Sequence, residues 1–483
     1  MVAVMSQDAA SSLNGSVSDS PSGALNASAR RRGWVSARPR WLLIVVAVVT
    51  AALWVSHMPA LLFHAQLYAD DGGWYQGAYT LGPLASLPHP AAGYFVVFQR
   101  LIASLSLLLP IIAVPTFFNA VALAVQIVGI CYLVSRRMEA AMPNLAIRVA
   151  IALLVIALPN AYDTPGNLTS TQWRLGLLAF LVMFAGPARR IAGHLLDAAT
   201  IVISGLSGPY CILLEPIAIW RWRRNPGDRR LIYLLVANTV CAAAQLVVIV
   251  DRLAVERSST PLAAGFYPLV RMVGRQITLG LIVGAHGLSA IVGTSIATNG
   301  VALTVLSLIP IAVCGWAALR GPAILRAFCY FALAVFALAL VAPSIAGFRW
   351  PSLGDPADIT NFHPGGLRYF LYPLLAFALS LGWFVITYGI PWLRSAIQPR
   401  GAPPAIMNAP AHAGVWIGRA VGVAAAGALA ASLVVGVRVD WTYPPYLEEH
   451  WAAQVHRLEV AAPGTEVVIP INPQGWTVSL VAR

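Results

Sequence analysis

Long apolar runs, separated by short clusters of arginine, constrain this chain more than any other feature. The first run covers residues 41–63, and a helix needs about 20 residues to cross about 30 Å of hydrocarbon. Of the 483 residues, 59 % are hydrophobic and 10 % are charged, whereas about 25 % of a soluble domain is charged. The sequence therefore predicts an all-α polytopic membrane protein and excludes a soluble globular domain.

The basic residues report on membrane topology. All 31 of them are arginines, and they give a net charge of +13. They lie between apolar runs rather than in one patch, so we attribute them to cytoplasmic loops and not to nucleic-acid binding. Arginines at 30–32, 38 and 40 precede the first run. We therefore predict a cytoplasmic N-terminus in a multi-pass protein of a bacterial inner (plasma) membrane.

Counting apolar runs from this starting point predicts about 11 transmembrane helices and an extracytoplasmic C-terminus. The further crossings are 116–134, 146–158, 175–185, two within 191–220, 231–250, 301–319, 327–345, 368–390 and 420–437. A glycine-rich stretch at 277–290 is predicted to be re-entrant. The pair within 191–220 is a hairpin, because Pro209 cannot continue an ideal helix. On this topology 20 arginines lie inside and 11 outside.

The first outer loop carries two adjacent carboxylates, Asp70 and Asp71, followed by Gly72 and Gly73. Carboxylates at a membrane surface suit a general base that meets a substrate whose lipid tail stays in the bilayer. The alternative is a solvated turn, since Asp-Gly is a common turn dipeptide. Residues 94–109 then form a short apolar stretch that ends at Pro110. This stretch predicts an interfacial helix in the same loop.

The chain divides into three predicted domains. Residues 1–40 lack an apolar pattern and predict a disordered cytoplasmic tail. Residues 41–437 form the multi-span membrane domain with the outer loops. Residues 438–483 predict a small extracytoplasmic α+β cap, with a helix at 447–460 and strands at 466–471 and 476–480. Such a small cap would be marginal alone and should dock on the membrane core.

Arginines on the outer face are candidates for binding an anionic phosphate at the membrane surface. Arg368 opens a late span and is the best placed, and Arg174, Arg271 and Arg275 are further candidates. The alternatives are interfacial anchors, loop ion pairs and an ordinary aromatic belt. Candidate substrate-binding residues beside these groups, all in the predicted outer loops, are Trp74, Tyr75, His89, His363 and Tyr369. A lone loop histidine is otherwise simply solvated.

Two acids, Asp197 and Glu215, fall within apolar stretches, where an unpaired charge is expensive. They are the basis of a rival hypothesis, a transporter or flippase of lipid-linked sugars or another amphiphile. Otherwise both lie near interfaces, with Asp197 close to Arg189 and Arg190 and Glu215 close to Arg221. A polysaccharide polymerase or ligase is a third class, but it would concentrate its polar residues in one late loop.

Metal and disulfide chemistry have little support in the sequence. The five cysteines lie inside apolar stretches without ligand spacing, so we expect neither a disulfide nor a zinc site. No metal constellation is evident, although Asp70 and Asp71 could bind a divalent cation. No other cofactor is predicted.

The features above resemble the GT-C superfamily of integral-membrane glycosyltransferases. The resemblance rests on the acidic first outer loop, the interfacial helix behind it, the many crossings, and Arg368-Tyr369-x-x-x-Pro373 at the start of a late span. It implies an inverting transfer of a sugar from a polyprenyl-phosphate donor to a glycan, lipid or protein acceptor on the outer face, with a first-loop aspartate as base. Asp70 is favoured, because Asp71 could bond the amides of the glycines that follow it. A second family carboxylate and an acceptor motif are not matched, so the acceptor is not predicted.

Overall fold

The computed structural model describes residues 41–91, 93–161, 166–255, 272–291, 293–345, 364–389 and 412–483. The chain forms two compact units, Met1–Val45 and Val46–Arg483. The predicted tail at 1–40, Arg271 and His363 lie outside the described residues. Everything below concerns the second unit.

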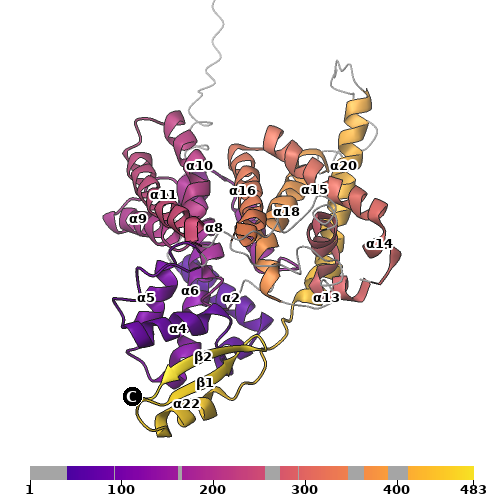
Figure 1. Cartoon of the computed structure of the whole chain (residues 1–483). Coiled ribbons are helices and arrows are strands. Elements are labelled where there is room, and N and C mark those ends of the chain that lie inside the picture. The colour runs from indigo at the N-terminus through magenta and orange to yellow at the C-terminus, as the bar shows by residue number, and fades with distance from the viewer. Residues whose placement is uncertain are drawn as a thin grey trace, which may run out of the picture. The chain divides into compact units, whose positions relative to one another are not determined.

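Helices make up most of the described chain (Figure 1). Those of the first half are α2 (Trp41–His57), α3 (Ala60–Phe63), α4 (Asp70–Leu81), α5 (Val97–Ser106), η1 (Ile111–Ala113), α6 (Val114–Val134), η2 (Arg136–Ala140), α7 (Leu145–Ile156), α8 (Thr171–Phe184), α9 (Ile191–Gly205), α10 (Tyr210–Arg224) and α11 (Arg229–Val255). Those of the second half are η3 (Val273–Leu279), α13 (Gly280–Ile291), α14 (Ser295–Thr298), α15 (Gly300–Arg320), α16 (Ala323–Ile345), η5 (Pro364–Phe370), α18 (Leu371–Phe384), η6 (Val385–Gly389), α20 (His412–Ala431), η7 (Ser432–Val437), α21 (Arg438–Asp440) and α22 (Trp451–Val460). The strands are β1 (Glu466–Ile471) and β2 (Trp476–Val481).

Five helical segments in the described part are long and apolar enough to cross a membrane. They are Ile111–Val134, Arg229–Asp251, Gly300–Arg320, Leu367–Gly389 and Ala420–Asp440. In four of the five, less than half of the apolar window is buried, so most of these side chains face outward, as lipid contact requires. Five shorter apolar helices accompany them. The membrane class is therefore confirmed, whereas the 11 crossings and the orientation of the termini stay predictions.

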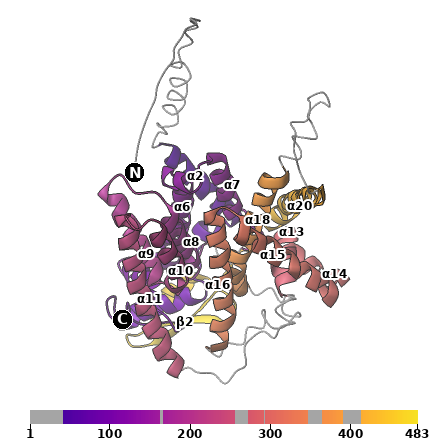
Figure 2. The same ribbon diagram turned by 90° about the horizontal axis from the view of Figure 1, so that it is seen from above.

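The helices pack in two groups. In the first, α6, α8, α9, α10 and α11 contact one another in sequence order. In the second, α15, α16 and α18 are mutual neighbours, and α20 joins α18 (Figure 2). Helix α10 packs on α16 and so connects the two groups. The stretch predicted to be re-entrant consists of η3 and α13, and α13 is kinked at Gly284, where φ is 74°.

The hairpin predicted within 191–220 is confirmed. At the end of α10, Arg221 donates to the carbonyl oxygen of Met183, in the last turn of α8. Near the start of α9, Asp197 pairs with Arg230, which also donates to Ala185 beside the same end of α8. The start of α9 and the end of α10 therefore lie together, and residues 206–209 turn the chain at the opposite end.

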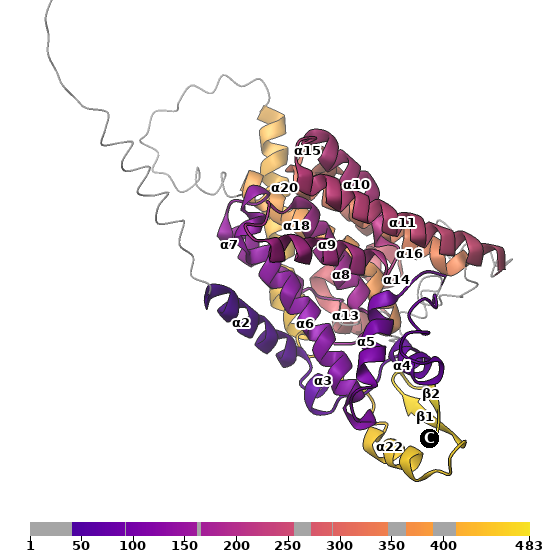
Figure 3. The same cartoon turned by 90° about the vertical axis from the view of Figure 1, so that its left-hand side faces the viewer.

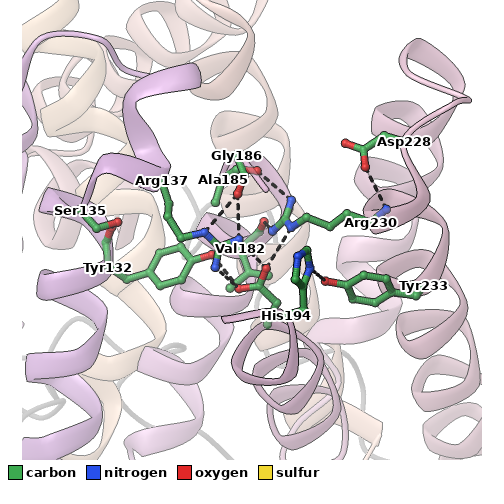
Figure 4. Close-up of polar contacts among 11 residues, drawn as sticks. Tyr132, Ser135, Arg137, Val182, Ala185, Gly186, His194, Asp228, Arg230 and Tyr233 are labelled. Carbon is green, nitrogen blue, oxygen red and sulfur yellow. Dashed lines mark hydrogen bonds and ion pairs between the residues drawn. The ribbon is translucent and has the colours of Figure 1, made fainter. Parts of the chain in front are cut away.

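A buried ion network holds this end of the first helix group together (Figure 4). Asp197 is fully buried and accepts from Arg137 at 2.5 Å and from Arg230 at 2.9 Å, and the Tyr132 hydroxyl donates to it at 3.0 Å. The two guanidinium groups also donate to the carbonyl oxygens of Val182, Ala185 and Gly186, at and just beyond the C-terminal end of helix α8.

The two intramembrane acids bond to residues outside their own helices. Asp197 pairs with Arg137 and Arg230, not with Arg189 and Arg190. Glu215 accepts hydrogen bonds from Asn238 and Thr239 of α11, each at 2.5 Å, instead of pairing with Arg221. Both acids bond across to other helices, because closeness in sequence along one helix does not bring two side chains to the same face.

The C-terminal cap was predicted to dock on the membrane core, and it packs on the segment of α4 and α5 and on the start of α6. Strands β1 and β2 pair antiparallel, with Glu466 opposite Val481, and α22 packs on β1. Strand β2 contacts α4, and α22 contacts η1 (Figure 3). Buried side chains from α4, α5, α6, α22 and both strands form one hydrophobic cluster. The cap therefore shares its core with the segment that carries Asp70 and Asp71.

The ion network generates the first prediction. Replacing Asp197 by alanine leaves Arg137 and Arg230 without their shared carboxylate, and removing one partner of a buried ion pair typically costs about 3–5 kcal/mol. We expect a large drop in the thermal unfolding temperature of the purified protein in detergent. Glu459→Ala, at an exposed position of α22, is the control and should change stability by less than about 0.5 kcal/mol. Equal unfolding temperatures for the two variants would contradict a stabilising role of the network.

Candidate functional site

The acidic pair opens a helix and does not lie in a turn or an extended loop. Helix α4 begins at Asp70, and both aspartates occupy its first turn. Negative side chains are favourable there, because unsatisfied N–H groups give a helix N-terminus a partial positive charge. The Asp-Gly-Gly sequence indicated a turn, but contacts with distant segments stabilise the helix instead.

Asp71 ties α4 to the segment that precedes α8. Its side chain is fully buried. It accepts from the backbone N–H of Thr169 at 2.7 Å, the Thr169 hydroxyl at 2.6 Å and the N–H of Leu168 at 3.3 Å. Burial raises the pKa of Asp71 to about 7, and the hydrogen bonds from residues 168 and 169 counteract part of that rise. Asp71 is thus occupied, as expected, but by these groups and not by the glycine amides.

Asp70 lies within electrostatic reach of a cation from the second half of the chain, Arg368. It is partly buried, and burial raises its pKa, while the positive charge of Arg368 lowers that pKa in part. Arg368 lies in η5, directly before α18, and its guanidinium carbon is 5.3 Å from the ring centroid of Tyr369. The structure therefore brings Asp70, Arg368 and Tyr369, three of the predicted site residues, into one region.

Aromatic side chains from four separate segments surround this charge pair. The Trp173 ring meets the Tyr369 ring edge-on at 5.2 Å and the Tyr210 ring at 5.8 Å. Tyr94 is partly buried, interacts electrostatically with Asp70, Arg368 and Tyr369 and hydrogen-bonds with the side chain of Gln172, and desolvation raises its pKa to about 12. The region thus combines a carboxylate, a guanidinium, neutral phenols, an indole and an amide. These are groups that can hold a sugar and a phosphate.

Sequence reasoning did not assign Tyr94, Gln172, Trp173 or Tyr210 to the site. A usable signal was present for the last three, because Gln172 and Trp173 begin α8 and Tyr210 follows the hairpin turn. On the predicted topology both places lie on the face that carries the first outer loop. Tyr94 also had a signal, since the stretch 94–109 was expected to form a wall of any site that contains Asp70; the helix itself begins only at Val97.

Arg174 and Arg275, the other two candidate phosphate-binding arginines in the described part of the chain, lie in different surroundings. Arg174 is buried, with its guanidinium 5.2 Å from the ring centroid of Trp54. Arg275 is buried in η3, which packs against α13 and α15. The contacts described here therefore group Arg368, and neither of these two, with Asp70.

The structure places Trp74 and Tyr75 in a hydrophobic core and His89 at the surface. Trp74 is 8 % exposed and Tyr75 1 %, and both pack in the core shared by α4 and the cap. Their position follows from the alternation of buried and exposed faces along α4. His89 is exposed; its ring bonds the carbonyl oxygen of Ala85 at 2.8 Å, and its own carbonyl oxygen accepts from Arg100 at 2.6 Å.

Among the described residues there is no group of three or more histidine, cysteine or acidic side chains that could hold a metal ion. Both carboxylate oxygens of Asp71 accept hydrogen bonds from N–H or O–H donors. A divalent cation bound to the aspartate pair would have to displace these donors, and such a cation stays a prediction.

Comparisons with known proteins give a distant likeness to a solved structure. No family model and no curated protein matches the chain. A solved structure that resembles it is the archaeal oligosaccharyltransferase AglB from Archaeoglobus fulgidus, in complex with an inhibitory peptide and a dolichol-phosphate. The identity is 13 % and the TM-score 0.38, and the match covers 87 % of this chain and 58 % of that one. The chain thus spans a little over half the length of that enzyme.

The different surroundings of the two aspartates predict different effects of the same substitution. In Asp71→Asn an amide NH₂ group replaces one carboxylate oxygen, so a backbone N–H that donated to that oxygen loses its acceptor. Leaving a buried polar group unpaired costs about 1–3 kcal/mol, so we expect this variant to unfold at a lower temperature. Asp70→Asn should unfold at the temperature of the unmodified protein. Thermal unfolding of both variants in detergent measures the difference. A stable Asp71→Asn protein would show that the bonds to Leu168 and Thr169 are dispensable.

Proposed function

We propose that this protein is a membrane glycosyltransferase that moves a sugar from a polyprenyl-phosphate donor to an acceptor hydroxyl. The observation that carries the proposal is the electrostatic interaction of partly buried Asp70 with Arg368, in a region that also holds aromatic side chains. The resemblance of the sequence to GT-C enzymes agrees with this chemistry. Asp70 is the proposed base, and Arg368 binds the phosphate.

The proposed reaction requires both charges. The acceptor oxygen attacks the anomeric carbon, the bond from that carbon to the phosphate oxygen breaks, and polyprenyl phosphate leaves. Asp70 takes the proton of the acceptor hydroxyl, and Arg368 stabilises the negative charge of the departing phosphate through a bidentate contact. Attack from the side opposite the leaving group inverts the anomeric configuration. Burial, which raises the pKa of Asp70, makes its carboxylate a stronger base.

The location of the cation suits a donor that is anchored in lipid. Arg368 is the second residue of the membrane-capable segment Leu367–Gly389, so a phosphate bound to it can remain attached to a polyprenyl chain in the bilayer. Trp173 and Tyr369 provide aromatic surfaces beside this position. Sugar rings pack their apolar faces on such surfaces, which supports a glycosyl phosphate as ligand.

The transporter hypothesis has lost one of its two supporting observations. Asp197 is fully engaged by two arginines and a tyrosine, as a residue that fixes helices together would be. Glu215 lines an apolar groove of about 560 Å³ between α10 and α11, and Asn238 and Thr239 donate to it. Glycosyl transfer explains the Asp70 region, and transport offers no role for it.

The first test of the proposal uses purified protein in detergent, where nothing can be transported between compartments. The unmodified protein should transfer sugar from a polyprenyl-phosphate donor. Asp70→Asn keeps the size of the side chain but removes the base, so the rate should fall by about 10² to 10⁴ while donor binding persists. No transfer by the unmodified protein, together with substrate flux in proteoliposomes, would instead establish a transporter.

The second test concerns pH. Because the charge of Arg368 lowers the pKa of Asp70, Arg368→Gln removes that effect and should raise this pKa further. The acid limb of the pH profile of kcat/KM should therefore move to higher pH in Arg368→Gln, in addition to weaker use of the donor. Arg368→Lys keeps the charge and should leave the limb near its original position. An identical acid limb in all three proteins would mean that Asp70 and Arg368 do not act together.

A further inference from the structure

The backbone directly before Asp70 is bonded to the C-terminal cap. The N–H of Ala69 donates to the carbonyl oxygen of Asn472 at 2.5 Å, and the N–H of Asn472 donates to the carbonyl oxygen of Leu67 at 3.0 Å. Tyr68 and Asn472 form a parallel bridge at the end of β1. Residues 67–69 therefore lie as a short third strand beside the cap.

This bonding holds a strained residue in place. Ala69 has φ 49° and ψ −124°, a conformation that residues with a Cβ atom rarely adopt. Strained backbone persists only where the surrounding structure over-determines it. The backbone of Ala69 sets the direction in which α4 starts, and hence the direction in which the side chain of Asp70 points.

The cap also contacts α4 along its length. Gly72 lies so close to the cap that an added Cβ atom would be 2.5 Å from Cδ1 of Ile471. One helical turn further on, the N–H of Ser479 donates to the side chain of Gln76 at 3.4 Å. At the far end, the Tyr79 hydroxyl donates to Val481 at 2.9 Å, and Arg483 donates to the Tyr79 carbonyl oxygen. These contacts leave α4 little freedom to tilt.

The cap is itself fixed to other parts of the fold. Inside the cap, the Asn472 side chain bonds the backbone N–H and carbonyl oxygen of Leu447 at 2.7 and 2.9 Å, which holds the end of β1 in place. The indole N–H of Trp451 donates to Ile111, at the start of a membrane-capable segment, at 3.3 Å. The N–H of Tyr443 donates to the carbonyl oxygen of His57 at 2.8 Å. The cap thus links α4 to α2 and to the start of α6, so the position of α4 is fixed relative to these helices.

We propose that the cap, residues 443–483, positions the side chain of Asp70 for reaction, and that Asn472 and Ile471 are the positioning residues through which it acts. Neither residue would touch the substrate; each acts on Ala69 or Gly72, which adjoin the aspartate pair. The catalytic part of this inference rests on the proposed function. Its structural part, the bracing of residues 67–72 by the cap, does not.

The experiment uses two adjacent glycines, of which Gly72 lies against Ile471 and Val478 of the cap and Gly73 does not. Gly72 faces Ile471, whereas an added Cβ atom at Gly73 meets nothing within 4 Å. Gly72→Val should force α4 and the cap apart, and Gly73→Val is the matched control, with the same change in helix propensity at the next position. Ile471→Ala removes as many carbon atoms as Gly72→Val adds, so the double variant should restore the packing.

Two measurements are made on all four proteins. Hydrogen exchange at residues 67–72 should become faster in Gly72→Val and return toward the original rate in the double variant. In the transfer assay, kcat should fall by about 10- to 100-fold in Gly72→Val, because misplacing a catalytic group by 1 Å can cost about 10²-fold. The KM for the donor should change little, since the Arg368 site is untouched. Gly73→Val should match the unmodified protein in both measurements.

The outcomes separate the two proposals. Faster exchange at residues 67–72 with an unchanged kcat would overturn the positioning role of the cap. Unchanged exchange in Gly72→Val would show that the cap does not brace this segment. Absence of transfer in the unmodified protein would overturn the proposed function, while the exchange data would still decide whether the cap braces α4.

Discussion

The hydrogen bonds that Asp71 accepts from Leu168 and Thr169 fix the geometry on which the candidate site depends. A buried carboxylate is tolerated only when it is paired, and here its three donors come from the segment just before α8. They join the start of α4, with Asp70, to the start of α8, with Gln172 and Trp173. The arrangement of the carboxylate, the amide and the indole thus follows from satisfying one buried group.

Adjacent aspartates acquire different properties from their surroundings. Helical geometry points successive side chains about 100° apart, so Asp71 turns into the protein and Asp70 turns toward Arg368. The first is saturated with hydrogen bonds and has a structural role. The second combines a raised pKa with a cation beside it, a combination found where groups do chemistry. The difference lies entirely in the contacts, since the residue type is the same.

The sequence predicted what depends on local pattern. Apolar runs indicated the membrane helices, Pro209 and the nearby arginines indicated the α9–α10 hairpin, and alternating residues at 466–471 and 476–480 indicated the cap strands. It did not predict helix α4, because Asp-Gly-Gly is a turn signal and only contacts with Thr169 and the cap override it. It also missed the partners of Asp197, because Arg137 and Arg230 come from other helices and residue spacing says nothing about such pairs.

Of the residues in the candidate site, mainly the charged ones could be predicted from the sequence. Asp70 and Arg368 each lie at the edge of an apolar run, where a charged residue is costly unless it has a function or a partner. Each could therefore be identified from the sequence as a candidate on its own. The sequence did not predict that these two residues lie close together, nor the hydrogen bond between Ala69 and Asn472. Both depend on how segments far apart in the chain pack together. Residues 443–483 carry no charged pair that suggests a site, yet they hold the backbone from which Asp70 projects. A search confined to chemically reactive residues would therefore overlook the part of this chain that fixes the backbone next to Asp70.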